Sequence, residues 1–425
     1  MSQMTATQKI LADHAGCEQV TAGEIITCRL DLAMANDVTA VPAIEEFKKL
    51  NTHQLWDKNK IVFVADHFTP NRDIKSAQMN KKLLDFVKEN DLPHFYDLGR
   101  GGIEHIILPE KGLVCAGQLV IGADSHTCTY GALGAFSAGV GSSDLAVALA
   151  TGEVWLKVPS AIKINLSGQL APFVSGKDLI LQIIGVLGVD GASYQSLEYA
   201  GQGVAALTMA DRLTVCNMSV ECGAKNGIFP VDKQTVDFMK QAGVSAYKAY
   251  AADEDAQYTN EYEFDLSQIP VTVAAPYLPS NIKRAEELSN VTLDQVVIGS
   301  CTNGRIEDFR VAAKLIKGRK IAPYLRCLVM PGSQLVYRQM LAEGLADIFV
   351  ESGSTLTMPT CGPCIGGHCG ILAAGEKALA TTNRNFIGRM GHKESQIYLA
   401  GAACAAASAV MGRIAHPSEL KEAGL

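Results

Sequence analysis

The 425-residue chain is 48% hydrophobic and 19% charged, which is typical of a globular protein with two or three domains. Its formal net charge of −7 argues against nucleic acid or an anionic membrane surface as a partner. The acidic amino-terminal thirty residues do not resemble a signal peptide, and the longest small-apolar stretch, 402–411, is too short to span a bilayer. Twelve cysteines without small-domain spacing indicate reduced thiols, and a cytoplasmic location is expected.

Short apolar runs alternate with amphipathic helical stretches, and this pattern predicts an α/β fold with largely parallel sheets. Strands are expected at residues 61–65, 119–122, 162–166, 271–274, 296–299 and 328–330. Helices are expected at residues 74–89, 142–157, 306–317 and 395–412. Ser142 is the expected N-cap of the second of these helices, with Asp144 supporting its first turn.

Two proline-marked breaks divide the chain. One lies near Pro159, where a glycine-rich half gives way to a strand, and the other lies at residues 276–280. The predicted domains are therefore residues 1–160, 161–280 and 281–425.

Several predicted strands run directly into ionisable or nucleophilic side chains. Asp66-His67 follows the first strand, Asp124-Ser125-His126-Thr127 the second and Ser300-Cys301 the strand at 296–299. Ligands of open α/β sheets bind beyond the carboxyl ends of the strands, so these groups are expected to gather there. A histidine beside an aspartate is a plausible general acid, although two polar loop residues at a strand end would give the same string.

Three cysteines suggest a metal or cluster site. Cys361 and Cys364 form a Cys-x-x-Cys pair, and Cys301 lies where a helix start would lower the pKa of a thiol. Three thiolates on an iron–sulfur cubane would leave one iron open as a Lewis acid. A zinc site with His368 and Cys369, or small residues in a turn, remain open alternatives from spacing alone.

Arg384 and Arg389 flank an apolar pair and a glycine. Paired guanidinium groups suit a dicarboxylate ligand, but two surface arginines would look the same.

Taken together, these strings resemble the aconitase superfamily, and within it the large subunits of isopropylmalate, homoaconitate and dimethylmalate dehydratases. The motifs that carry the resemblance lie at residues 31–39, 65–67, 124–127, 217–221, 299–303, 360–364 and 383–389. The resemblance implies three α/β/α domains packed around an iron–sulfur cluster, with the mobile fourth domain absent from this chain. It also favours the cluster over zinc.

The resemblance implies roles for individual residues. Cys301, Cys361 and Cys364 would hold a [4Fe–4S] cluster whose fourth iron is labile and binds substrate. His67, paired with Asp66, would protonate the departing hydroxyl. The remaining implied residues are His105 paired with Glu221, Asp124 and His126 near the bound water, and the substrate-binding Asn36, Ser125, Asn217, Asn383, Arg384 and Arg389.

The implied activity is a hydro-lyase that isomerises a branched malate by dehydration and rehydration. The first candidate substrate is 3-isopropylmalate, of leucine synthesis, and 2,3-dimethylmalate and homoaconitate are the alternatives. Asn36 stands where relatives carry Gln or His, which affects the substrate expectation. A separate small subunit is expected to supply the swivelling domain, with its serine base and further arginines.

Two other functions remain as alternatives. An iron-sensing RNA-binding regulator would require a basic, aromatic-bearing strip, which the acidic chain lacks. A pure electron carrier would require Cys369 as a fourth cluster ligand.

Overall fold

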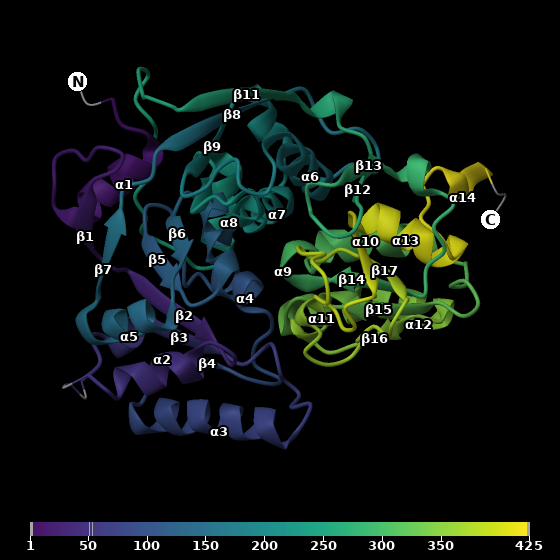
Figure 1. Cartoon of the computed structure of the whole chain (residues 1–425), viewed down its shortest axis with the longest axis horizontal. Coiled ribbons are helices and arrows are strands. Elements are labelled where there is room, and N and C mark those ends of the chain that lie inside the picture. Colours follow the sequence, from purple (N-terminus) through teal and green to yellow (C-terminus); the bar gives the residue numbers. More distant parts are fainter. Residues whose placement is uncertain (1–2, 51, 53, 423–425) are drawn as a thin grey trace.

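The computed structural model describes residues 3–50, 52 and 54–422. Figure 1 shows the amino-terminal part, in purple and blue, on one side and the carboxyl-terminal part, in green and yellow, on the other. Three main sheets and a two-stranded ribbon carry the strands, and most strand pairs are parallel. The α/β class predicted from the sequence is confirmed. None of the helices within residues 3–50, 52 and 54–422 is long and apolar enough to cross a bilayer.

The first sheet has five parallel strands in the order β4-β3-β2-β5-β6. Its central strands β2, β3 and β5 are buried at every position, as expected where helices cover both faces of a parallel sheet. The strands are β2 (Leu32–Asn36), β3 (Ile61–Val64), β4 (His94–Tyr96), β5 (Leu119–Gly122) and β6 (Phe136–Gly139). The helices of this part are α1 (Ala6–Ala15), α2 (Ala40–Phe47), η1 (Lys58–Lys60), α3 (Ile74–Glu89), α4 (Glu104–Glu110), η2 (Ser125–Leu133) and α5 (Ser142–Thr151).

The second sheet has four parallel strands in the order β10-β9-β8-β11. Its strands are β8 (Ala161–Ser167), β9 (Ser196–Ala200), β10 (Asn226–Ile228) and β11 (Asn260–Asp265). The helices around it are α6 (Gly176–Leu187), η3 (Gln202–Ala206), α7 (Met209–Asn217), η4 (Ser219–Cys222), α8 (Lys233–Gln241) and η5 (Leu266–Gln268).

The third sheet has seven strands in the order β13-β12-β18-β17-β14-β15-β16, parallel from β18 to β16. Its strands are β12 (Thr272–Ala274), β13 (Ile282–Arg284), β14 (Gln295–Gly299), β15 (Arg326–Met330), β16 (Thr355–Leu356), β17 (Lys377–Ala380) and β18 (Gln396–Leu399). The helices are η6 (Ala285–Leu288), α9 (Ser300–Asn303), α10 (Ile306–Ile316), α11 (Gln334–Ala342), α12 (Leu345–Ser352), η7 (Gly362–Ile365), α13 (Ala402–Met411) and α14 (Glu419–Glu422). Because β12 precedes residue 281, this sheet begins inside the range predicted for the second domain.

The helix predicted at 142–157 is wrong in its second half. Gly152, at φ 71°, ends α5, and β7 (Glu153–Lys157) follows and pairs antiparallel with β1 (Ile25–Arg29). Exposed and buried residues alternate along β7, which is a strand period. The N-cap is Gly141 rather than Ser142, and its N–H donates to the Asp144 carboxylate at 3.2 Å.

The helix predicted at 395–412 is wrong in its first part. Residues 396–399 form β18 because they pair in register with β17, and α13 begins only after Gly401. The helices predicted at 74–89 and 306–317 are confirmed as α3 and α10.

The fold brings the polar strand ends together. The carboxyl ends of the parallel strands β2, β3 and β5 lie at the same end of the first sheet. In the third sheet, β14 leads directly into the short helix α9. Cys301, Cys361 and Cys364 pack against Ile103 and Ile106 in a small buried cluster. Residues from three distant parts of the chain therefore surround one cavity.

Candidate active site

The Asp66–His67 pair forms a tight turn after β3. Both side chains are buried, and His67 Nδ1 donates to Asp66 Oδ1 at 2.6 Å. Burial alone would lower the pKa of His67, but the charge and hydrogen bond of Asp66 outweigh it and raise that pKa well above the usual value. The other ring nitrogen, Nε2, is the one left to exchange a proton in the cavity that His67 lines.

Asp37, which the sequence reasoning missed, holds this turn. Its Oδ1 accepts the backbone N–H groups of Asp66 and His67 at 3.2 and 2.9 Å, and its Oδ2 accepts that of Phe68 at 2.7 Å. Consecutive side chains on a strand point to opposite faces, so His67 can meet Asp66 only where the chain turns. Asp37 fixes that turn. The signal in the sequence that could have identified Asp37 is its position, as an acidic residue directly after the fully buried strand β2.

His105 pairs with Asp124, not with Glu221 as predicted. His105 Nε2 lies 2.9 Å from Asp124 Oδ1, and its Nδ1 lies 3.1 Å from the hydroxyl of Tyr130. Both ring nitrogens of His105 are thus engaged. The predicted pairing is wrong because Glu221, on η4, approaches a different histidine.

That histidine is His126. Its Nε2 lies 2.9 Å from Glu221 Oε1, and its backbone N–H donates to Asp124 Oδ1 at 2.7 Å. Burial and the Arg384 charge oppose protonation, but hydrogen bonds to Asp124 and Glu221 outweigh them and raise the pKa of His126 to about 9. Glu221 also accepts a hydrogen bond of 2.9 Å from Arg384 Nε.

Both the oxygen and the nitrogen of the Asn36 side-chain amide are hydrogen-bonded, which fixes the orientation of this side chain. Its Oδ1 accepts the N–H groups of Val38 and Thr39 at 3.0 and 3.1 Å, and its Nδ2 donates to Glu104 Oε1 at 2.9 Å. Glu104, a second residue that the sequence reasoning missed, is fully buried in the cavity wall. Burial and the charges of Asp66 and Asp124 raise its pKa well above the usual value, which favours the protonated form of Glu104.

Two asparagines connect the second sheet's helices to the cysteines. Asn383 Nδ2 lies 3.3 Å from Asn217 Oδ1 and 3.2 Å from Cys301 Sγ, while Cys364 Sγ donates to Asn383 Oδ1 at 3.3 Å. Buried Lys177 donates to the carbonyl oxygens of Thr381 and Thr382 at 2.9 and 2.5 Å and so holds the segment before Asn383.

The three thiols fit an iron–sulfur cluster. A hydrogen bond from Cys361 and the positive charge of His126 lower the pKa of Cys301 to about 5, and Cys361 with Arg389 lowers that of Cys364. Arg389 Nη2 lies 3.8 Å from Cys364 Sγ. The hydrogen bonds with Cys301 and Cys364 raise the pKa of Cys361 well above its usual value. Two of the three buried thiols therefore lose their protons readily, and thiolates are the soft ligands that iron–sulfur clusters take.

The alternative of a zinc site needs His368 and Cys369 as ligands beside the three thiols, and neither residue lies in the cavity. His368 Nε2 lies 2.9 Å from Thr360 Oγ1, and Cys369 is exposed.

The cavity has a volume of about 260 Å³. Twelve of the predicted site residues line it: Asn36, His67, His105, Asp124, Ser125, His126, Cys301, Cys361, Cys364, Asn383, Arg384 and Arg389. The other three, Asp66, Asn217 and Glu221, lie behind it and bond to residues that do. The arrangement combines three thiols, three histidine–carboxylate pairs and two guanidinium groups around one small polar space.

The aconitase family model (aconitate hydratase) matches residues 8–285 and 277–412. The chain belongs to the aconitase family. A solved structure, aconitase X from Thermococcus kodakaraensis, is similar in fold, with a TM-score of 0.50 and 11% identity over 89% of each chain.

Several curated members of the aconitase family are close in sequence. The 3-isopropylmalate dehydratase large subunit of Acetivibrio thermocellus is 57% identical over 98% of this chain and 100% of that protein. Proteins of the same name are 56% identical in Clostridium kluyveri and 55% identical in Desulfitobacterium hafniense, each over 98% of this chain and 99% of the relative. The family assignment made from the motifs is confirmed.

Proposed function

We propose that this chain is the large, catalytic subunit of a 3-isopropylmalate dehydratase, a hydro-lyase that interconverts 2- and 3-isopropylmalate. The observation that carries the proposal is the cavity with three thiols and three histidine–carboxylate pairs, in a chain 55–57% identical to proteins of that name. The reaction removes a proton and a hydroxide from neighbouring carbons. It then adds water back so that the hydroxyl group and the hydrogen have exchanged carbons.

Cys301, Cys361 and Cys364 would hold a [4Fe–4S] cluster. When bound, such a cluster with one iron free of cysteine supplies a labile Lewis-acid position for a hydroxyl and a carboxylate. Asn383 contacts Cys301 and Cys364 and would orient these ligands.

His67 acts as the general acid for the hydroxyl that leaves. Hydroxide is a poor leaving group, so a proton must arrive as the carbon–oxygen bond breaks. The Asp66 carboxylate holds Nδ1 and raises the pKa of the ring, which favours the protonated form and leaves the Nε2 proton for the substrate. Asp124, which His105 holds, and His126, which Glu221 holds, position the water that re-enters.

Arg384 and Arg389 bind the substrate carboxylates. Glu221 holds Arg384 at 2.9 Å, which fixes the direction of its guanidinium group. The two guanidinium groups hold the unsaturated intermediate while it re-orients between dehydration and rehydration.

A separate small subunit completes the site by supplying the base that removes the carbon-bound proton. The proposal is supported by the relatives' designation as large subunits and by their match to this chain over almost their whole length. If this chain alone, with its cluster rebuilt, turned over 3-isopropylmalate at the rate of the two-subunit enzyme, the small-subunit part of the proposal would be refuted.

The test is anaerobic reconstitution with iron and sulfide, followed by EPR and by assays with a small subunit. The expected result is a three-iron signal on mild oxidation, restored by Fe²⁺ to a form perturbed by 3-isopropylmalate. The assay compares 3-isopropylmalate, 2,3-dimethylmalate and homocitrate, and a higher kcat/KM for either of the last two would replace the proposed substrate. A cluster that keeps four irons and ignores all three acids would support the electron carrier instead.

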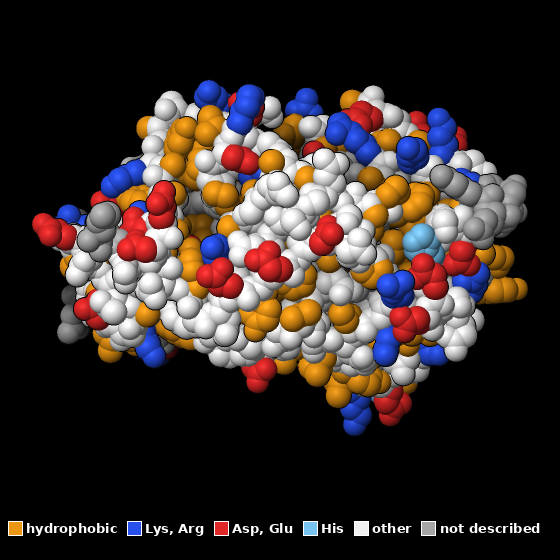
Figure 2. Space-filling model, turned by 90° about the horizontal axis from the view of Figure 1, so that it is seen from above, with side chains coloured by type: hydrophobic (Ala, Val, Ile, Leu, Met, Phe, Trp, Pro, Cys, Tyr) orange, Lys and Arg blue, Asp and Glu red, His pale blue; other side chains and the backbone are white. Residues whose placement is uncertain are grey.

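The RNA-binding alternative finds no support on the face seen in Figure 2. Acidic and basic side chains are interspersed there, and no continuous basic strip crosses it. Phosphate backbones bind to clustered cations, so a mixed surface favours the enzyme.

A further inference from the structure

Lys177 is a cationic side chain that the fold buries completely. It lies in the first turn of α6 and is 0% exposed. A cation near the amino terminus of a helix is disfavoured by the helix dipole, and burial of an ammonium group adds a further cost. Lys177 therefore destabilises its own helix, and the compensation must come from the groups that surround its ammonium group.

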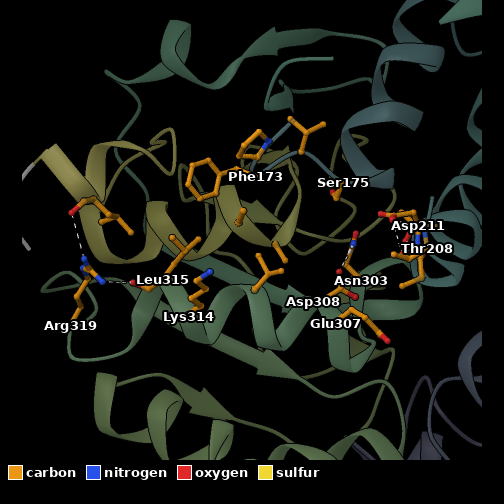
Figure 3. Close-up of a pocket in the computed structure, with 18 residues that line it drawn as sticks. Phe173, Ser175, Thr208, Asp211, Asn303, Glu307, Asp308, Lys314, Leu315 and Arg319 are labelled. Carbon is orange, nitrogen blue, oxygen red and sulfur yellow. Dashed lines mark hydrogen bonds between the residues drawn. The ribbon is translucent and has the colours of Figure 1, made fainter. Parts of the chain in front are cut away.

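The start of α6 lies close to the helix that carries the first thiol. Ser175, the N-cap of α6, and Asn303, the last residue of α9, line one cavity (Figure 3). Cys301 belongs to the same short helix α9. The Lys177 side chain thus extends from a helix of the second sheet into the third sheet, where it meets the end of β17.

The ammonium group of Lys177 binds two backbone carbonyl oxygens. Its Nζ donates to those of Thr381 and Thr382 at 2.9 and 2.5 Å. The Thr381 oxygen also accepts the hydroxyl of Thr302 at 2.5 Å, and Thr302 follows Cys301 directly in the chain. The ammonium group and the segment that carries Cys301 therefore share one acceptor.

The second carbonyl leads to the same thiols. Thr382 directly precedes Asn383, whose Nδ2 lies 3.2 Å from Cys301 Sγ and whose Oδ1 accepts from Cys364 Sγ at 3.3 Å. A neutral donor would satisfy the two carbonyl oxygens equally well, so these hydrogen bonds alone do not require a cation. The positive charge of Lys177 needs a separate reason.

The thiols supply the opposite charge. Burial lowers the pKa of Lys177 to about 8, while the charges of Cys301 and Cys364 oppose that shift and favour the ammonium form. Three thiolates outweigh the positive charge of an iron–sulfur core, so the loaded site would be negative overall. His126 and Arg389 offset this charge from within the cavity, and Lys177 lies outside it.

We propose that Lys177 is a positioning residue that acts as a buried counter-charge for the iron–sulfur cluster, through the backbone next to Cys301 and Asn383. The inference rests on the proposed function, because it requires that the three thiols hold the cluster. Nearby charge sets the reduction potential of a cluster, and a positive charge favours the reduced form. Removal of the charge should therefore lower the potential, whereas a change in packing alone should not.

The test compares Lys177→Met, which removes the charge at nearly constant length, with Lys177→Arg, which keeps it. The full chain is reconstituted anaerobically and oxidised mildly, and its three-iron cluster is then reduced in steps while the EPR signal is followed. At one fixed potential, we expect the ratio of reduced to oxidised cluster to fall about 10-fold in Lys177→Met, which is about 59 mV for a one-electron couple. Lys177→Arg should stay within about 2-fold of the wild-type ratio.

Lys225→Met is the matched control. Lys225 is a half-buried lysine that donates to the carbonyl oxygen of Gly139 at 2.9 Å and does not line the active-site cavity, so its loss should leave the potential unchanged. If Lys177→Met does not fold, Lys177→Gln replaces it, because glutamine keeps an N–H donor without the charge.

A wild-type potential in the neutral Lys177 variant overturns the proposal, and so does an equal shift in Lys225→Met. In either case the proposed function stands, because the cluster is still present. A wild-type chain that assembles no cluster would refute the proposed function and this inference together, so the two failures can be told apart.

Discussion

The backbone N–H of Cys361 donates a hydrogen bond of 2.8 Å to the carbonyl oxygen of Asp66. Thr360 Oγ1 donates to the same oxygen at 2.8 Å. The turn that carries His67 is therefore fastened directly to the loop that carries a thiol of the proposed cluster. Since the N–H side of the same turn is held by Asp37, small changes on either side should alter the placement of His67.

Asp37→Asn tests this positioning role. The amide can accept through only one atom, and its NH₂ would face an N–H donor of the turn, so His67 should lose its alignment. We expect kcat to fall about 10- to 100-fold with KM and iron content little changed. Steady-state kinetics and iron analysis of the two-subunit enzyme provide the measurement. A change in KM alone would contradict the role.

Cys301→Ser tests the proposed ligand set against Cys369. Loss of one of three thiolates should abolish cluster retention, since serine oxygen is a poor ligand for iron in this setting. Cys369→Ser is the matched control because this residue is exposed and outside the cavity. Iron and sulfide content after anaerobic reconstitution are measured. If Cys369→Ser lost the cluster and Cys301→Ser kept it, the assignment would be reversed.

Arg389→Lys tests recognition of the substrate carboxylate. Lysine keeps the charge but lacks the planar pair of donors. We expect KM for 3-isopropylmalate to rise about 10-fold or more, with a smaller effect on kcat. Arg413→Lys, which alters the peripheral ion pair with Glu419, should leave KM unchanged. Equal effects of the two substitutions would argue against a substrate contact.

The His14–Asp31 pair should stabilise the fold within a limited pH range. His14 Nε2 lies 2.7 Å from Asp31 Oδ2, and although burial opposes it, this contact raises the pKa of His14 and lowers that of Asp31. The contribution of His14 is therefore complete below pH 6.5 and is lost as the pH rises through its raised value. That of Asp31 is present above pH 3.8 and is lost as the pH falls through its lowered value.

His14→Asn should accordingly cost about 1 kcal/mol of stability near pH 5.5 and less near pH 8.5. Thermal melting of wild type and variant at both pH values is the measurement. A melting-temperature difference that grows towards pH 8.5 would contradict the assigned direction.

The sequence by itself determined the α/β class, the polar ends of β3, β5 and β14, and the family. These follow from local patterns, because apolar runs with strand or helix periods and the residues that end them are contiguous in the chain. It failed at 142–157 and 395–412, where a composition compatible with helix was overruled by pairing of β7 with β1 and of β18 with β17.

Only the tertiary structure decided which groups meet. It paired His126, rather than His105, with Glu221, and it brought Asp37 under the His67 turn and Glu104 against Asn36. Such choices depend on the directions of side chains from segments up to 95 residues apart, which differ by a few ångströms between one partner and another. Local sequence patterns carry no information at that scale, because hydrogen bonds form or fail over less than an ångström.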